Sequence, residues 1–232
     1  MQALENLPLS VLDWVALVWF LFCWLGYSRY ANTHEKSLMT VMARWRDRWA
    51  MAMLKRDNRI MDSQVIMGLS GVVTFFCSTS LFITAGLFAA IAASEEIVAL
   101  LNQLSFVIKT EVSVVELKLA LMIVIFIYAF FKFAWSMMQH SYSAVILASV
   151  SNDDAEKSEQ DEAVAKLMSR LSTLGAQHFN DGVRSYYYAL SVISWFIHPL
   201  VFILVISWVI LVLYRRDFYS KMVKHLRKTI GE

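Results

Sequence analysis

The sequence has few charged residues and few cysteines for its length. Only 17% of its 232 residues are charged, whereas 58% are hydrophobic. An ordinary soluble domain is roughly 25% charged and 45–50% apolar, so this balance indicates that most of the chain lies in lipid. Both cysteines, Cys23 and Cys77, fall inside apolar runs. This placement argues against a disulfide framework and favours packed thiols.

The sequence also lacks the motifs of common catalytic and binding sites. It has no histidine pair flanking a glutamate, no glycine-rich phosphate loop, no nucleophile elbow and no clustered cysteine ligands. We therefore expect no enzymatic activity, no metal and no cofactor. Its basic residues lie at predicted membrane surfaces, which argues against nucleic acid as a partner. The first twenty residues lack a basic cluster and a cleavage pattern, so we expect the first span to remain in the mature protein.

Long apolar runs predict an all-α integral membrane protein. About 20 apolar residues are needed to cross a hydrocarbon core of about 30 Å. Four runs meet this length, and the last is interrupted by His198 and Pro199. The predicted spans cover about residues 10–30, 64–93, 116–148 and 186–214. Because no separate soluble domain is visible, residues 1–232 are predicted to form a single helical membrane domain.

The third span contains a lysine, Lys132, inside its hydrophobic run. An ionisable group within a span normally faces protein or water and has a partner. Asp57 and Asp62, which come just before the second span, are the candidate counter-ions. We expect one of them to pair with Lys132 near the cytoplasmic face.

The segment of residues 36–59 has the pattern of an amphipathic helix. Apolar residues recur every three or four positions, while Arg44, Arg48 and Lys55 follow the opposite face. This pattern predicts an interfacial helix that lies on anionic lipid headgroups. In contrast, the acidic run at residues 151–162 predicts a solvated loop.

Orientation follows from the distribution of lysine and arginine. With both termini outside, the cytoplasmic segments hold twelve Lys and Arg residues against seven outside. This favours a multi-pass protein of the bacterial inner membrane with both termini outside. The basic tail after Tyr214 is an exception, because this orientation places its lysines and arginines outside. A re-entrant hairpin at Pro199 would bring the tail inside, although its two arms would be too short to cross.

This orientation gathers polar residues from three helices at the cytoplasmic face. One interpretation is a structural layer of ion pairs, and the other is a polar vestibule or headgroup site. The residues, in addition to Lys132, are Arg56, Asp57, Asn58, Arg59, Asp62, Gln139, His140, Tyr142, His178, Asn180, Asp181 and Arg184.

Two further polar features lie along the predicted spans. Glu116 and Lys118 open the third span on different sides of a helix, so each needs its own partner. On the second span, small and polar residues recur at helical spacing. Such a stripe indicates close helix packing or, alternatively, a solute path lined by hydroxyl groups. It consists of Gln64, Gly68, Gly71, Thr74 and Ser78.

Several blocks of residues resemble the bacterial and plant membrane family numbered 599 among domains of unknown function. The blocks are Arg56–Asp62; Phe75, Phe76 and Ser78–Ser80; Glu116–Lys118; Ala129–Trp135 with Tyr142; His178–Asn180, Gly182, Arg184 and Tyr186; and Tyr214–Arg216 with Phe218. Where that family has phenylalanine and asparagine before the tyrosine of the fourth of these blocks, this chain has His140 and Ser141. The resemblance implies an integral membrane protein with several spans, and it implies no activity.

The leading hypothesis is a homo-oligomer that forms a path for an ion or small solute. A path lined by Lys132 and the arginines would favour anions. The alternative is a non-transporting accessory protein that binds anionic lipid or a partner through residues 36–59 and the basic tail. A third hypothesis, a lipid-modifying enzyme that uses His140 or His178 with Asp57 or Asp62, lacks a recognisable motif.

Overall fold

The computed structural model describes residues 9–105, 107–150 and 159–230, and every regular element in this part of the chain is helical. Four stretches are long and apolar enough to cross a membrane: Val11–Met53, Ile60–Ala92, Val112–Ser149 and Pro199–Thr229. The predicted all-α membrane fold is confirmed. The elements are α2 (Val11–Thr33), α3 (Leu38–Met53), α4 (Ile60–Ala92), α5 (Ser94–Leu101), α6 (Val112–Ser149), α7 (Glu159–Ile193), η1 (Ser194–Phe196), α8 (Pro199–Tyr214), η2 (Arg215–Tyr219) and α9 (Lys221–Ile230).

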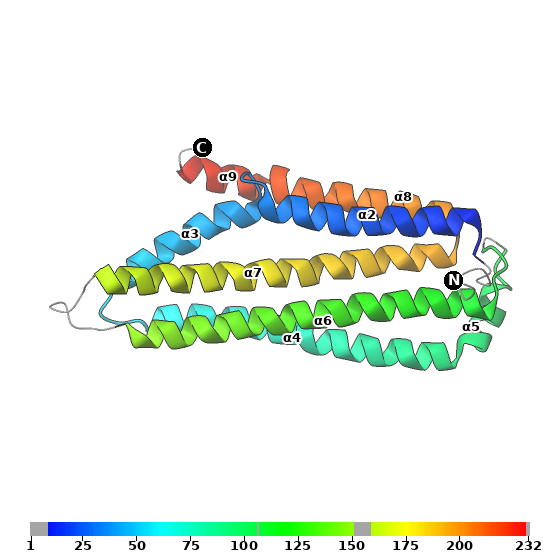
Figure 1. Cartoon of the computed structure of the whole chain (residues 1–232), viewed down its shortest axis with the longest axis horizontal. Coiled ribbons are helices and arrows are strands. Elements are labelled where there is room, and N and C mark those ends of the chain that lie inside the picture. Colours follow the sequence, from blue (N-terminus) through cyan, green and yellow to red (C-terminus); the bar gives the residue numbers. More distant parts are fainter. Residues whose placement is uncertain (1–8, 106, 151–158, 231–232) are drawn as a thin grey trace, which may run out of the picture.

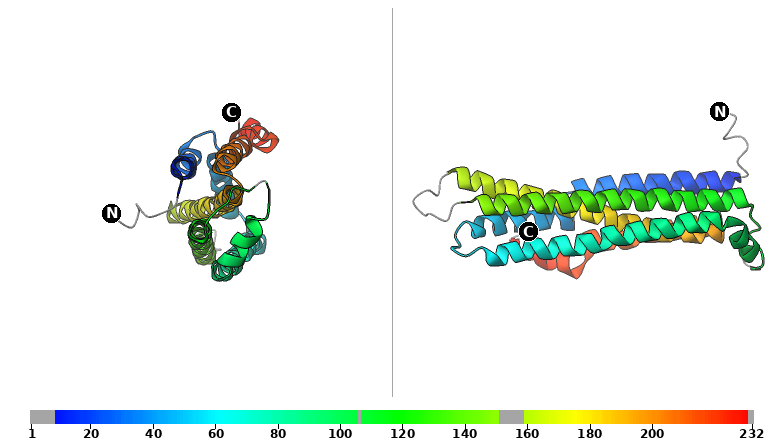
Figure 2. Two further views of the ribbon diagram at one scale, coloured as in Figure 1. Left: turned by 90° about the vertical axis from the view of Figure 1, so that its right-hand side faces the viewer. Right: turned by 90° about the horizontal axis from the view of Figure 1, so that it is seen from below.

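The helices form an elongated bundle with α7 at its centre (Figure 1). On one side of α7 lie α2 and α8, with α3 continuing from the end of α2, and on the other side lie α6 and α4 (Figures 1 and 2). We call the end that carries α5 the α5 end, and the opposite end, where α3 meets α4, the α3 end. With 33, 38 and 35 residues, the helices α4, α6 and α7 are about 50 to 57 Å long.

Local sequence signals set several helix boundaries. The Ser10 hydroxyl accepts a hydrogen bond from the Asp13 backbone N–H, and the Asp13 carboxylate accepts one from the Ser10 backbone N–H at 3.0 Å. This reciprocal capping box begins α2. At α8, Pro199 is the first helical residue, where its missing N–H costs little. The His198 Nδ1 atom accepts a hydrogen bond from the backbone N–H of Leu200 at 3.0 Å, so His198 caps a freed N–H group.

The prediction of one interrupted span over residues 186–214 is wrong. The helix α7 ends at Ile193, the chain turns, and α8 runs back from Pro199 in the same direction as α2 (Figure 1). Trp19 Nε1 donates to Ser207 Oγ at 3.1 Å, and Tyr27 OH donates to Asp217 Oδ2 at 2.9 Å, which fixes this parallel register.

The fold-back has a physical cause in the contacts around the turn. Lys118 Nζ donates to the backbone oxygen of Trp195 at 2.9 Å, and the Trp195 indole donates to Asp13 at 2.7 Å. The sequence suggested a hairpin whose two arms are too short to cross a membrane. The first arm, α7, is instead a helix of 35 residues that begins at Glu159. The start of α2 therefore lies at the α5 end, whereas the basic tail lies further along the bundle toward the α3 end (Figure 1).

The predicted amphipathic helix exists as α3, but its apolar face is covered by protein. Ala50 and Met53 are buried in a cluster with Ile66, Leu147 and Met168 from α4, α6 and α7. The prediction that this face lies on lipid is therefore wrong. The charged face remains exposed, as predicted for Arg44, Arg48 and Lys55. Most of the predicted acidic loop falls at residues 151–158, outside the described residues.

Candidate functional site

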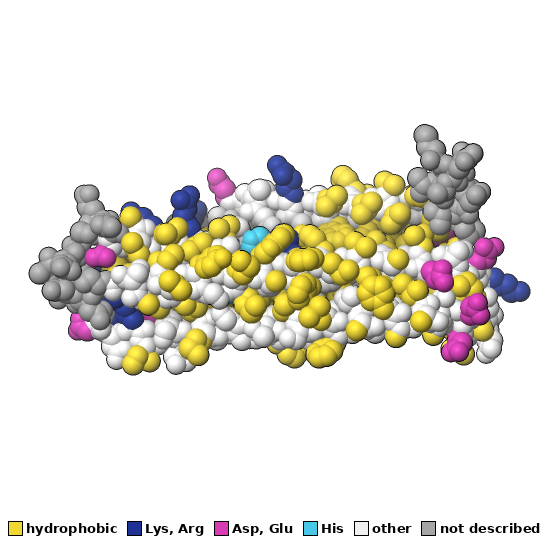
Figure 3. All heavy atoms as spheres, turned by 60° about the horizontal axis from the view of Figure 1, so that its bottom comes forward, with side chains coloured by type: hydrophobic (Ala, Val, Ile, Leu, Met, Phe, Trp, Pro, Cys, Tyr) yellow, Lys and Arg dark blue, Asp and Glu magenta, His cyan; other side chains and the backbone are white. Residues whose placement is uncertain are grey.

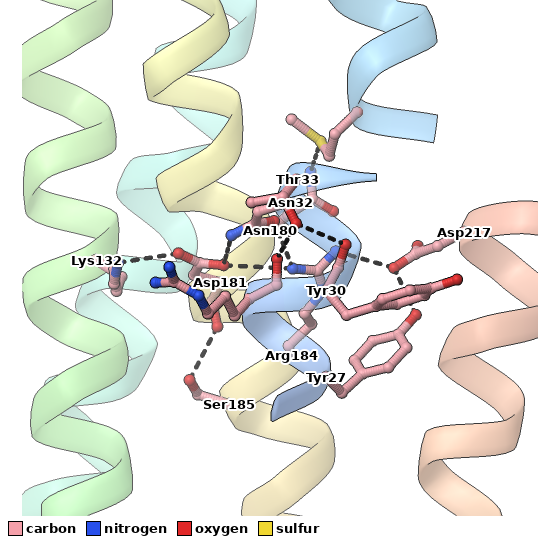
Figure 4. Close-up of polar contacts among 12 residues, drawn as sticks. Tyr27, Tyr30, Asn32, Thr33, Lys132, Asn180, Asp181, Arg184, Ser185 and Asp217 are labelled. Atoms are coloured by element: carbon pink, nitrogen blue, oxygen red, sulfur yellow. Dashed lines mark hydrogen bonds and ion pairs between the residues drawn. The ribbon is translucent and has the colours of Figure 1, made fainter. Parts of the chain in front are cut away.

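The main polar feature of the described chain is a layer of paired side chains halfway along the bundle (Figure 4). Four helical segments contribute to it, namely α2, α6, α7 and η2. We call this group the polar layer. It consists of Tyr27, Asn32, Lys132, Asp181, Arg184 and Asp217.

Asp181 lies at the centre of the polar layer. Its Oδ2 atom accepts a hydrogen bond from Lys132 Nζ at 2.9 Å, and its Oδ1 atom accepts one from the Asn32 amide at 2.9 Å. Arg184, one turn further along α7, approaches Oδ1 at 3.4 Å. The Lys132 ammonium also lies 5.4 Å from the centre of the Tyr128 ring. Asp181 therefore ties α6 to α2 through charge-assisted contacts.

Asp217 closes the other side of the layer. Its Oδ2 atom accepts from Arg184 Nη2 at 2.9 Å and from Tyr27 OH at 2.9 Å, and its Oδ1 atom accepts from Arg216 Nε at 2.8 Å. The π-helical turn η2 turns Asp217 and Phe218 inward. These contacts attach the end of α8 to α2 and α7.

Burial makes this pairing strong and leaves little free charge. Arg184 is 1% exposed and Asp217 is 3% exposed, so either ion alone would be costly to bury. Two carboxylates face Lys132 and Arg184, and the partly exposed Arg216 adds a further cation at the edge. The layer is a closed network of ion pairs and offers no unpaired nucleophile or base.

The predicted pairing of Lys132 with Asp57 or Asp62 is wrong. Asp62 instead pairs with Arg56 and accepts a hydrogen bond from Trp49 Nε1 at 2.7 Å. The residue of α4 at the level of Lys132 is Phe76, whose ring lies 5.5 Å from that of Phe133. Asp62 comes fourteen residues before Phe76, about 21 Å along the helix, so its carboxylate cannot reach Lys132.

The remaining residues of the predicted cluster are dispersed. Asp57 is exposed, and Arg59 Nη1 donates to the backbone oxygen of Val150 at 2.6 Å. The His178 ring packs edge-on against Trp135, and the Asn180 amide donates to the backbone oxygen of Ala176 at 3.0 Å. Gln139 packs beside Gly175, and Tyr142 is exposed. Of the predicted cluster, the structure brings only Lys132, Asp181 and Arg184 together in the layer.

Near the α5 end, Glu116 and Lys118 have separate partners, as expected from their spacing. Glu116 accepts a hydrogen bond from Ser94 Oγ at 3.0 Å, whereas Lys118 donates to Trp195. Lys118 is 5% exposed and lies 5.3 Å from the Trp195 ring centre. Both residues therefore hold the turns at this end in place.

The polar stripe of the second span faces outward, although the Thr74 hydroxyl reaches Met137 Sδ of α6 at 3.5 Å. Gln64, Gly68, Gly71, Thr74 and Ser78 are all exposed. A Cβ atom added at Gly68 or Gly71 would have no atom within 4 Å. Thr74 donates to the Ser70 backbone oxygen at 2.9 Å. We call these five residues the α4 stripe.

Comparison with known proteins identifies a family but no activity. The model of the family described as "Protein of unknown function, DUF599" matches residues 15–222. The chain belongs to this family. No curated protein and no solved structure matches it. The family model confirms the resemblance seen in the polar blocks.

Sequence reasoning missed three members of the polar layer. Tyr27 and Asn32 lie at the end of an apolar span, and Asp217 lies in a basic tail. The one available signal was Asp217 itself, an acidic residue directly after two arginines. In the part of the chain that the structure describes, no three His, Cys, Asp or Glu side chains gather in a way that could hold a metal ion.

Proposed function

We propose that this membrane protein is a non-transporting accessory protein that self-associates through the α4 stripe. The observation that carries the proposal is the outward position of α4. Only 11% of the residues in its most apolar stretch are buried, compared with 50% in α6. Small residues on an outward helix face allow the backbone of another helix to approach closely.

The membrane is best placed between the α5 end and the polar layer. Along α6, the distance from Val112 to Lys132 is about 30 Å, which matches the thickness of a hydrocarbon core. The fold-back of α8 supports an orientation in which the basic tail lies on the same side as residues 29–62. Residues 29–62, residues 149–185 and the tail now share one side with eighteen Lys and Arg residues, against one in residues 94–115. The α3 end then faces the cytoplasm of a bacterial inner membrane.

In this placement, most of the α4 stripe extends beyond the hydrocarbon core. Phe76 lies at the level of the polar layer, and Gln64 to Thr74 lie on its α3 side. Apolar side chains are spread over the middle of the visible face, and charged side chains lie mainly toward its ends and along its upper edge (Figure 3). Exposed neighbours such as Met61, Val65 and Met67 need a protein partner where lipid chains do not reach.

A second copy of this chain is the partner that suits the α4 stripe. No charged residue occurs between Gln64 and Ala93, so two such faces can meet without repulsion. A two-fold interface would place each stripe against itself. The Gln64 amide and the Ser78 hydroxyl, which have no hydrogen-bond partner within the described chain, would then bond across the interface.

The described residues offer little support for the path for an ion or small solute. Between the levels of Lys118 and Lys132, the interior is filled by Ile125, Tyr188 and Phe202, each 0% exposed. Lys132 is neutralised by Asp181, so it does not supply the anion preference that the sequence suggested. We therefore place the transport hypothesis second. In our proposal the protein is also not an enzyme, and loss of both His140 and His178 should leave its association intact.

The test compares two glycines that face outward from different helices. Gly71→Leu adds a large side chain to the α4 stripe, whereas Gly26→Leu adds the same side chain to α2, where nothing lies within 4 Å either. Mass determination in mild detergent should give an oligomer for the wild type and for Gly26→Leu, and a monomer for Gly71→Leu. An oligomer for all three would refute the α4 interface.

Ion flux in liposomes separates the accessory role from transport. We expect the wild type, Lys132→Ala and Lys132→Glu to show only background flux. A flux whose preference between anions and cations changes with the charge at residue 132 would overturn the proposal. It would favour the hypothesis of a path for an ion or small solute.

A lipid-binding role is supported by a separate observation. The helix α9 packs beside α3 (Figure 1), and both helices carry exposed basic residues, Arg44 and Arg48 on α3 and Lys221 and Lys224 on α9. Neutralising Arg44, Arg48 and Lys55 together should weaken association of the α3 end with vesicles containing anionic lipid. Unchanged association would exclude this role.

A further inference from the structure

A small cavity lies on the α3 side of the polar layer, where four helices meet. Its volume is about 160 Å³, and it is lined by Arg46 from α3, Leu69, Val72 and Val73 from α4, His140 from α6 and Asn180 from α7, among others. One water molecule occupies about 30 Å³ in the liquid, so the cavity has room for roughly five. This volume suits a single phosphate or carboxylate group.

Two polar groups in the wall of this cavity lack partners. His140 is 2% exposed, and its Nδ1 atom is buried without a hydrogen bond. The Arg46 Nη1 atom is also buried without a partner. A buried cation without a counter-charge is costly, and no carboxylate is among the residues that line the cavity.

The position of His140 is fixed by packing. A Cβ atom on Gly175 would lie 3.1 Å from the His140 Cε1 atom, so the imidazole rests directly on the α7 backbone. A ring held in this way presents a nitrogen at a fixed place beside the guanidinium. Together they offer N–H donors of the kind that bind oxyanions.

We propose that Arg46 and His140 form a binding site for an oxyanion, a phosphate or carboxylate group. Two sources share this chemistry, a lipid headgroup and a free anion. His140 lies eight residues beyond Lys132, about 12 Å along α6, which is close to headgroup depth in our membrane placement. Leu69 and Val72, both exposed, extend the apolar wall to the outside. The site does not depend on association through the α4 stripe.

The test measures binding of two probes to the full chain in non-ionic detergent. The probes are dioctanoyl phosphatidic acid and inorganic phosphate. We expect Arg46→Gln to weaken binding about tenfold, the effect of losing one charge-assisted contact. The matched control is Arg170→Gln, which removes the same charge from an exposed position on α7, and it should change affinity less than about twofold.

Thermal unfolding provides a second measurement on the same variants. Without a probe, Arg46→Gln should unfold at a higher temperature than the wild type, because it removes a cation whose Nη1 atom is buried without a partner. With saturating probe, the order should reverse, because only the wild type gains from binding. If Arg46→Gln fails to fold, Arg46→Lys keeps the charge but loses the planar fork, and it should also bind more weakly than the wild type.

The outcomes of the displacement experiment show whether the site binds an oxyanion and from which source. Binding of the lipid that phosphate cannot displace identifies a headgroup site, and displacement by phosphate identifies a site for a free oxyanion. No binding of either probe, or equal loss in Arg46→Gln and Arg170→Gln, would overturn the proposal.

Discussion

Asp181→Asn and Lys132→Met, made singly and together, test whether the polar layer holds the bundle together. The two side chains are 10% and 15% exposed, so the pair is largely removed from water. Removing one partner of a buried pair costs 3–5 kcal/mol. Partial exposure places Asp181→Asn at the lower end, about 3 kcal/mol, because it leaves the Lys132 ammonium without its carboxylate.

The two single substitutions should differ in their effect. After Lys132→Met, Asp181 still accepts hydrogen bonds from Asn32 and faces Arg184, so we expect a loss of about 1–2 kcal/mol. The double variant should be more stable than the sum of the two losses predicts, by at least about 1.5 kcal/mol, because residues in one network are coupled.

The assay is unfolding in mixed micelles by titration with denaturing detergent, followed by the fluorescence of the eight tryptophans. The matched control is the same cycle with Lys132→Met and Asp62→Asn. Asp62 pairs with Arg56 instead. The losses of unfolding free energy caused by Asp62→Asn and Lys132→Met should therefore add to within about 0.5 kcal/mol. Additive losses for Asp181, or coupling between Lys132 and Asp62, would refute the assignment.

Three further predictions follow from the fold. Gly182→Ala should destabilise the protein by about 1–3 kcal/mol, because its Cβ atom would lie 2.5 Å from the Phe133 ring, whereas Gly26→Ala should show no loss in the same unfolding assay. His198→Ala should cost about 1 kcal/mol through loss of the α8 cap, and His198→Asn should recover most of it. A reporter fused after the last residue should give the same sidedness as one inserted in residues 54–59, and opposite signals would contradict the fold-back of α8.

Parts of this structure were predictable from the sequence because they depend on local chemistry. Apolar runs of sufficient length must form helices in lipid, since each backbone polar group needs a partner there. This argument located α2, α4 and α6 to within a few residues. The high cost of an unpaired charge within a span also predicted a partner for Lys132, Glu116 and Lys118, and each of the three has one.

The identity of those partners could not be predicted, because it depends on how helices align along their axes. Lys132 and Asp181 are 49 residues apart in sequence and meet only because α6 and α7 pack side by side. The predicted partner Asp62 lies too far along α4 to reach Lys132. The same holds for α3. Its amphipathic pattern predicts a buried face but does not say whether lipid or protein covers it.

The sequence by itself determined a helical membrane protein whose few intramembrane charges are paired. Only the tertiary structure decided that α8 folds back beside α2, that Asp181 and Asp217 neutralise the layer, and that the α4 stripe faces outward. The physical reason is that helix formation and burial are set by neighbouring residues, whereas pairing and exposure are set by the contacts between helices. Those contacts exist only once the bundle has formed.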